Sequence, residues 1–80
     1  MSSSRLKKEL QDGKAVFGFD KTIKNIKQGK TKVVFLASNC PSDLKYRISL
    51  YNVEMVELKE ENDAVALICK RPHPVSVVSF

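Results

Sequence analysis

The most regular hydrophobic stretch of the chain is the uninterrupted run Val33–Ala37, and a cluster of turn-forming residues follows it at 38–43. A short run of β-branched and aromatic residues without alternating polar positions is typical of a strand covered on both faces. Ligands of α/β proteins usually meet the loops beyond strand ends. We therefore expect residues 33–37 inside a sheet, with the loop at 38–43 on a functional edge.

Two weaker patterns stand at the start of the chain. Ser4 is a candidate N-cap of a first helix, in which Leu6 and Leu10 lie one turn apart on one face. We expect this helix to end before Gly13, because glycine adopts the left-handed capping conformation at low cost. The following residues, 14–18, predict a short strand.

A second helix is predicted from Asp20, its candidate N-cap, to Gln28. Its apolar residues are Ile23 and Ile26, and lysines occupy much of the remaining surface. Such a thin apolar stripe is typical of a surface helix that buries one narrow face. A short basic link at 28–32 then leads into the apolar run.

A third helix is predicted after the loop, from the candidate N-cap Ser42 to about Tyr51. Leu44, Ile48 and Tyr51 have the spacing i, i+4 and i+7, which places them on one helical face. Residues 53–58 alternate apolar and acidic positions, which is typical of a strand with one solvated face.

The last part of the chain holds a segment of ambiguous pattern. Residues 64–69 are short and apolar, which fits a helix or a strand; we favour a helix, because strands and helices otherwise alternate and a crossover is needed. The segment 60–63 before it is a loop with capping residues. The loop Arg-Pro-His-Pro at 71–74 is rigid, since two prolines fix φ and remove two donors. Residues 75–80 predict a final strand.

The predicted order is helix–strand, repeated four times. This order favours an α/β fold, a three-layer α/β/α sandwich around a four-stranded mixed sheet. Eighty residues allow one small core and not two, so we expect a single domain over residues 1–80.

The charge of the chain is uneven. The formal net charge is +5, with eleven Lys/Arg and four Asp/Glu in residues 1–50 against three and five in residues 51–80. A basic first half suits a polyanionic partner such as nucleic acid. On charge alone, a solvated lysine-rich surface explains the pattern equally well.

Several classes of protein do not fit. No apolar run approaches the ~18 residues of a membrane span, and the charged start of the chain lacks the apolar region of a signal peptide, so we expect a cytoplasmic protein without membrane contact. Two cysteines complete neither a zinc spacing nor a disulfide framework, so we expect no metal. We also expect no cofactor and no small-molecule substrate.

The two cysteines are expected to be reduced thiols. Cys40 lies in the loop after the apolar run, and His73 is the single histidine, so a small thiol enzyme that uses this pair is a remote alternative. No orienting Asp or Asn can be identified from the sequence, and we therefore expect no catalytic residue. Cys69 is expected to be buried apolar filler.

Four motifs stand in register along the first half of the chain: GKAVFGF at 13–19, KTIK at 21–24, QGKTKVV at 28–34 and LASNCP at 36–41. Together they resemble the eukaryotic and archaeal large-subunit ribosomal protein thirty, a family of the kink-turn RNA-binding superfamily. The segment RPHPV at 71–75 is more weakly similar to the last loop and strand of that family. The family fold is the sandwich predicted above.

The resemblance implies binding to ribosomal RNA at three places, beside neighbouring ribosomal proteins. They are the turn into the second helix, the asparagine after the central strand and the loop before the last strand. Glycine allows close backbone approach to phosphate, an amide can contact one extruded base, and lysines can contact phosphates. The residues expected to contact RNA are Gly18, Lys21, Thr22, Lys24, Lys30, Lys32, Asn39, Arg71 and His73.

The chain departs from the family pattern in several places. Asp20 stands where the family usually has a lysine, and Asp63-Ala64 stands where it has Asn-Glu. The third helix and its following loop are shorter, and the tail after the last strand is missing. Many phosphate contacts are therefore favoured over strict kink-turn recognition. A free RNA-binding regulator, or a small ribonucleoprotein subunit of the same superfamily, remains an alternative.

Overall fold

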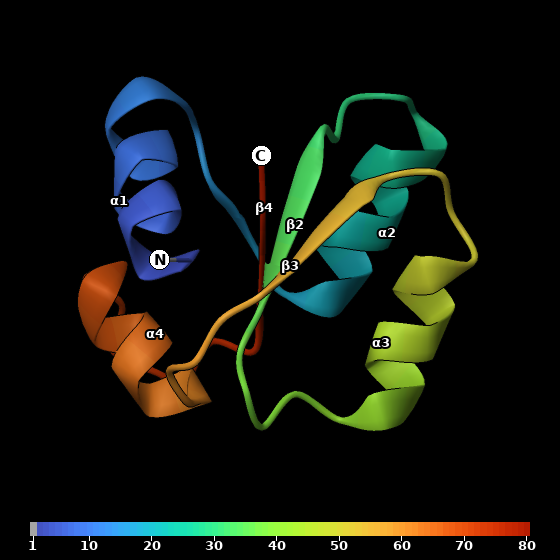
Figure 1. The fold of residues 1–80 in the computed structure, drawn as a ribbon. Helices are drawn as coiled ribbons and strands as arrows, with labels where there is room; N and C mark the ends of the chain where they lie inside the picture. The colour runs from blue at the N-terminus through green and yellow to red at the C-terminus, as the bar shows by residue number, and fades with distance from the viewer. Residues whose placement is uncertain (1) are drawn as a thin grey trace.

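The fold was analysed in a computed structural model that describes residues 2–80. Helices and strands alternate along the chain as predicted (Figure 1). The elements are α1 (Ser2–Asp12), β1 (Val16–Phe17), α2 (Phe19–Lys27), β2 (Val33–Leu36), α3 (Ser42–Ser49), β3 (Glu54–Glu57), α4 (Asn62–Ile68) and β4 (Val77–Ser79). The helix favoured for residues 64–69 is confirmed, although it begins earlier, at Asn62.

The strands form one four-stranded mixed sheet in the order β1-β4-β2-β3. Strand β2 lies in its interior, antiparallel to β4 and parallel to β3. Phe35 is the partner of Val78 on one side and of Val56 on the other. The predicted interior position of the apolar run is therefore confirmed, as is the α/β sandwich.

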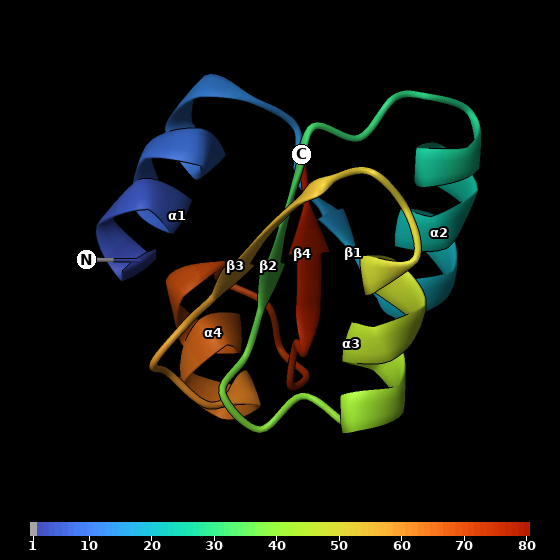
Figure 2. The same ribbon diagram turned by 45° about the vertical axis from the view of Figure 1, so that its right-hand side comes forward.

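Helices cover both faces of the sheet, α1 and α4 on one and α2 and α3 on the other (Figures 1 and 2). Successive side chains of β2 alternate between the two cores. Val33 and Phe35 belong to the cluster beside α1 and α4, whereas Val34 and Leu36 belong to the cluster beside α2 and α3. An apolar run without polar alternation is needed because both faces of β2 are dry.

Strand β3 corrects one prediction. Met55 and Val56 are both half-buried and pack into opposite cores, so the expected single wet face is wrong. Glu54 receives two hydrogen bonds from the guanidinium of Arg5, at 2.6 and 2.7 Å. These bonds lower the pKa of the Glu54 carboxyl below its usual value. The acidic ends of the strand thus stay in water, while its centre is covered on both sides.

The predicted helix caps at Ser4, Asp20 and Ser42 are wrong, since each residue lies inside its helix. Helix α2 begins at Phe19, after Gly18, and α3 begins at Ser42, after Pro41. Neither start has a side-chain cap. The carbonyl of Pro41 accepts the first bonds of α3 from the N–H groups of Leu44 and Lys45, so backbone geometry replaces the expected serine.

The ends of the elements differ by a few residues from the predictions. Helix α3 stops at Ser49, and the N–H groups of Leu50 and Tyr51 close its end with bonds to the carbonyls of Arg47 and Ile48. This tighter final turn leaves Tyr51 outside the helix, half-buried. Cys69 is also only partly buried, against the cluster beside α1 and α4.

One polar pair is buried between α2 and the sheet. The hydroxyls of Thr22 and Ser79 lie 3.0 Å apart, and the two residues are 0% and 1% exposed. Ser79 is the partner of Val16 and Val34 in the sheet, so its side chain faces α2. Each hydroxyl is the hydrogen-bond partner of the other in an interior where a lone polar group is costly. The prediction that the Thr22 side chain contacts RNA is therefore wrong.

The buried pair yields a stability prediction. Thr22→Val or Ser79→Ala alone leaves one buried hydroxyl unpaired and should lower the free energy of unfolding by about 1–3 kcal/mol. The double variant removes both polar groups and should be less destabilised than the sum of the two. Denaturant unfolding of all four proteins measures this coupling. Additive losses would contradict the pairing.

Candidate nucleic-acid interface

The topology brings three loops to one edge of the sheet. Both β1 and β2 run antiparallel to β4, so their carboxyl ends lie beside its amino end. The turn at Gly18, the loop that contains Asn39 and the segment 71–74 therefore meet at this edge, called the loop edge below. It is the lower end of the molecule in Figures 1 and 2.

Gly18 forms the turn between β1 and α2. Its φ of 99° and ψ of 153° lie in a region that is essentially restricted to glycine. Its N–H donates to the carbonyl of Val77, and its carbonyl accepts from the N–H of Thr22. A Cβ built there has no heavy atom within 4 Å. The backbone conformation alone requires glycine, and the space outside it is free for a partner.

The segment 71–74 is anchored at both ends of α4. Lys70 adopts a left-handed conformation, with φ of 57°, and turns the chain out of the helix. The N–H of Arg71 then bonds the carbonyl of Ala66, and the N–H of Val75 bonds the carbonyl of Asn62. The prolines have no N–H to satisfy, so they remain exposed without an unpaired donor. The segment is thus held close to the sheet.

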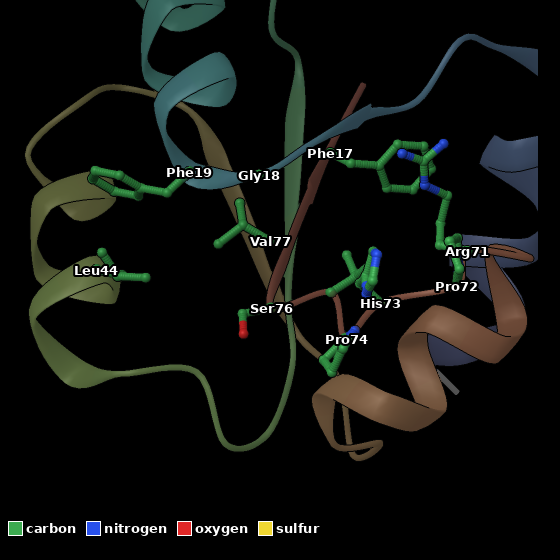
Figure 3. A pocket seen from close by; sticks show the side chains of 11 residues that line it. Phe17, Gly18, Phe19, Leu44, Arg71, Pro72, His73, Pro74, Ser76 and Val77 are labelled. Carbon is green, nitrogen blue, oxygen red and sulfur yellow. The ribbon is translucent and has the colours of Figure 1, made fainter.

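A hollow of about 240 Å³ separates this segment from the turn at Gly18 (Figure 3). Arg71, His73 and both prolines line one side, and Phe19 and Leu44 face them from the other. The guanidinium carbon of Arg71 lies 4.5 Å from the ring centroid of Phe17. This cation–π contact orients the guanidinium, whose N–H donors stay exposed.

Asn39 joins the loop after β2 to the start of α4. Its Oδ1 accepts a hydrogen bond from the N–H of Asn62 at 2.9 Å, and its Nδ2 donates to Oδ1 of Asn62 at 3.1 Å. The neighbouring N–H of Ser38 donates to the carbonyl of Glu60. The Asn39 side chain is exposed and has one more N–H and one more lone pair than these bonds use. It fixes the loop and can still contact a ligand.

The predicted lysines do not all lie at this edge. Lys21 is exposed in the first turn of α2, close to Gly18, and Lys24 is exposed one turn further along. Lys30 and Lys32 precede β2, so they lie at the opposite end of the sheet from Asn39. The structure therefore places Lys21 and Lys24 on the helix that starts at the loop edge but not Lys30 and Lys32, because β2 separates the two ends of the sheet.

The comparisons with known proteins agree on one family. The family described as "Ribosomal protein L7Ae/L30e/S12e/Gadd45 family" matches residues 2–80. The chain is 37% identical over 79 residues to the large ribosomal subunit protein eL30 of Sulfurisphaera tokodaii, with 94% of this chain and 74% of that protein covered. It is 30% identical over 73 residues to the eL30 protein of Methanosarcina mazei, with 91% and 71% covered. The chain belongs to this ribosomal protein family.

Solved structures support the same family fold. A protein of unknown function from Bacillus halodurans C superposes with a TM-score of 0.81 at 15% identity, covering 98% of this chain and 81% of the other. The 15.5kD RNA binding protein of Giardia lamblia superposes with a TM-score of 0.74 at 19% identity, covering 92% and 65%. The match to the family model and to the eL30 proteins confirms the resemblance carried by the four motifs.

The loop edge of this family member is mixed in charge. Lys21 and Arg71 are accompanied by Asp20 and Asp43, in the first turns of α2 and α3, and by Asp63, in the first turn of α4. Ala64, where the sequence also departs from the family pattern, is half-buried and donates its N–H to Oδ1 of Asp63. The edge therefore carries acidic as well as basic side chains, because carboxylates are stabilised at helix starts.

Two contributors to the edge were missed in the sequence. Phe17 supports Arg71, and Asn62 shares the amide pair with Asn39. The sequence predicts Phe17 only as part of a short strand, although an aromatic residue directly before a glycine turn must border that turn. The contact between Asn39 and Asn62 joins segments 23 residues apart and has no local signal.

The two thiols of this family member lack the lowered pKa of a reactive cysteine. Cys40 is 6% exposed, and its Sγ lies 3.7 Å from the carbonyl oxygen of Pro41. Burial raises the pKa of the Cys40 thiol, more than the nearby charge of Lys45 lowers it. The pKa of Cys69 is raised by burial too. His73 lines the hollow of Figure 3 and Cys40 does not, so the proposed thiol pair is not brought together there.

None of the four helices between residues 2 and 80 has the length and apolar character of a membrane span. Within the same residues, His, Cys, Asp and Glu side chains form no group of three that could hold a metal ion.

The amide pair at the loop edge yields a second prediction. Asn39→Ala removes both bonds to Asn62 and should lower the free energy of unfolding by about 1 kcal/mol, which corresponds to a Tm lower by about 4–8 °C. Asn39→Asp keeps an acceptor for the N–H of Asn62 near a helix start and should lose less. Thermal unfolding followed by circular dichroism measures both; equal losses would contradict the role of the acceptor.

The buried thiol yields a third prediction. In a Cys69→Ser variant, the rate of Cys40 alkylation by iodoacetamide should titrate above the ordinary thiol pKa of 9.0. The raised pKa keeps the thiol protonated in the folded state, so this contribution to stability is present below pH 9 and is lost as the pH rises through the folded pKa. The same protein in urea is the control. A midpoint below that of the unfolded control would favour a reactive thiol.

Proposed function

We propose that the chain is a structural protein of the large ribosomal subunit that binds ribosomal RNA through the loop edge. The observation that carries this proposal is the convergence of three segments, distant in sequence, on one edge. The turn at Gly18, the loop at Asn39 and the segment 71–74 are the places where the family resemblance implies RNA contact. The names of the eL30 relatives supply the ribosomal context.

The hollow beside Gly18 is suited to one unstacked base. At about 30 Å³ per water molecule, its 240 Å³ equal roughly eight waters, which admits a planar heterocycle. His73 and the two neighbouring prolines present flat or apolar surfaces for stacking. Arg71, oriented on Phe17, directs its donors to a phosphate or a base edge.

The turn at Gly18 and the side chain of Asn39 complete the proposed contact. The first N–H groups of α2 have no intrahelical acceptors and suit a phosphate oxygen. The open space above Gly18 lets a backbone approach closely. The unused donor and acceptor of Asn39 can contact a base edge while its bonds to Asn62 stay in place.

The acidic residues at the edge set the character of this binding. Asp20, Asp43 and Asp63 surround the contact, so attraction to the bulk charge of RNA is weak there. We infer that stacking and hydrogen bonding supply most of the affinity, with Lys21 and Arg71 as the phosphate contacts. Strict kink-turn recognition remains disfavoured, because Ala64 cannot hydrogen-bond a guanine through its side chain.

A second candidate function uses the same edge. A free RNA-binding regulator, or a small ribonucleoprotein subunit, would bind RNA in the same way without residing in the ribosome. The structural likeness to the 15.5kD RNA binding protein of Giardia lamblia motivates this alternative. In both cases we infer a non-enzymatic protein, since burial raises the pKa of both thiols. We infer a cytoplasmic location from the ribosomal context of the eL30 relatives.

Contacts with neighbouring ribosomal proteins belong to the proposal as well. The acidic stretch 54–63 is the natural surface for a basic neighbour. Part of it is already occupied, since Glu54 binds Arg5 and Glu57 lies 3.7 Å from Nζ of Lys45. Glu61, at the start of α4, remains exposed.

The proposed edge yields a fourth prediction. His73→Ala should weaken binding to the organism's own large-subunit ribosomal RNA by about 5- to 150-fold, the range expected for loss of one stacked base. Arg71→Gln should also weaken it and lower the slope of log K against log salt by about 1. Filter binding at several salt concentrations measures both. Lys8→Gln, on exposed α1, is the matched control.

Two outcomes would contradict parts of this proposal. Unchanged affinity in both edge variants would remove the site, even if the RNA still binds. Sedimentation of cell extracts at low salt separates the two functions, since a ribosomal protein should travel with large subunits and be released only by high salt. A protein that stays at the top of the gradient would favour the regulator.

A further inference from the structure

The lysines that do not reach the loop edge gather at the opposite end of the sheet. Ser79 is the partner of both Val16 and Val34, so these three residues lie in one row across β1, β4 and β2. Lys14 and Lys32 each lie two residues before this row in the sequence, ahead of the parallel strands β1 and β2. Both side chains are exposed.

Helix α2 brings two more lysines to this end. Lys27 is its last residue, and the N–H of Lys30 donates to the carbonyl of Asn25, which holds the following loop against the helix. The N–H of Lys32 donates to the carbonyl of Phe80 in turn. The connections into β1 and β2 are both at the upper end of the molecule in Figures 1 and 2. We call Lys14, Lys27, Lys30 and Lys32 the lysine end.

Few carboxylates oppose these lysines. Between residues 13 and 42 the chain has six lysines and one acidic residue, Asp20, which lies at the start of α2, at the loop edge. Glu54, at the start of β3, is bound by Arg5. Asp12 is the other acidic residue that lies close in sequence to Lys14. The lysine end therefore concentrates the positive charge that the loop edge lacks.

We propose that the lysine end binds the phosphate backbone of a second RNA segment, so that the protein joins two segments of RNA. The chemistry of the lysine end favours this partner. Its four ammonium groups are point charges on flexible stems, which suit phosphates without requiring a fixed geometry. Lysine side chains contain no aromatic ring or amide that could recognise a particular base. The contact is therefore independent of sequence and strongly dependent on salt.

The two surfaces face in opposite directions. The molecule extends 24 to 28 Å along its principal axes, and the length of the sheet separates the lysine end from Asn39. A straight duplex seated against one end does not reach the other. This inference rests on RNA as the partner of the chain, and the two surfaces can be tested separately.

The first experiment compares variants on a mixed-sequence RNA duplex of 16 base pairs. The triple variant Lys14→Gln, Lys30→Gln and Lys32→Gln should bind it about tenfold more weakly than the unmodified protein at low salt, with a slope of log K against log salt lower by about 2–3. The control triple Lys7→Gln, Lys8→Gln and Lys59→Gln changes the net charge equally at other exposed positions. Equal losses in the two triples would overturn the proposal in favour of a solvated lysine surface.

A second experiment separates the lysine end from the loop edge. The double variant Arg71→Ala and His73→Ala should lose affinity for large-subunit ribosomal RNA and still bind the duplex. The lysine triple should do the reverse. If the edge variant also loses the duplex, the two RNAs share one surface and this proposal fails, whereas the loop-edge function stands. Circular dichroism of each variant confirms that folding is unchanged.

The bridging itself is tested by capture on beads. Biotinylated duplex should retain large-subunit ribosomal RNA in the presence of the unmodified protein, and the lysine triple should abolish this retention. Retention that persists with the lysine triple would overturn the proposal. Stronger binding of the lysine end to an acidic peptide, such as hexaglutamate, than to the duplex at equal salt would also overturn it in favour of a protein partner.

Discussion

The burial of β2 on both faces is the constraint on which the rest of the structure depends. Four consecutive residues, Val33–Leu36, are at most 4% exposed, and they alternate between two cores. One short strand therefore requires two pairs of helices, one for each face. The ring of Phe35 meets that of Phe80 edge-to-face at 5.7 Å, which ties the end of the chain to this centre. Everything at the two ends of the sheet is positioned by this strand.

The elements that the sequence could predict are those whose signals are local. The apolar run, the spacing of Leu44 and Ile48, and the motifs before residue 42 all carry their information within a few neighbouring positions. The predicted helix starts are wrong because backbone hydrogen bonds determine where the helices begin. The N–H of Gly18 bonds the carbonyl of Val77, and the carbonyl of Pro41 replaces a serine side chain as the cap. The burial of Thr22 depends on Ser79, 57 residues away, and no local pattern indicates it.

The candidate site shows a different kind of error. Lys30 and Lys32 come before β2 and Asn39 comes after it, so a strand between them already requires that they lie at opposite ends. That separation could have been deduced from the sequence. The partnership of Asn39 with Asn62 could not, because it depends on how α4 packs. The same amide holds the loop in place and retains unused hydrogen-bonding capacity, which couples the stability of the edge to its capacity for binding.

Strand β3 has a consequence for the protein before it meets any partner. It is an edge of the sheet, since within residues 2–80 it pairs only with β2, and its outer backbone groups can accept a strand from another molecule. A glutamate stands at each end of this four-residue strand. Arg5 and Lys45 already pair with these glutamates, and a four-residue strand offers few backbone hydrogen bonds to a second copy. This edge strand is therefore a poor template for association between copies of the protein.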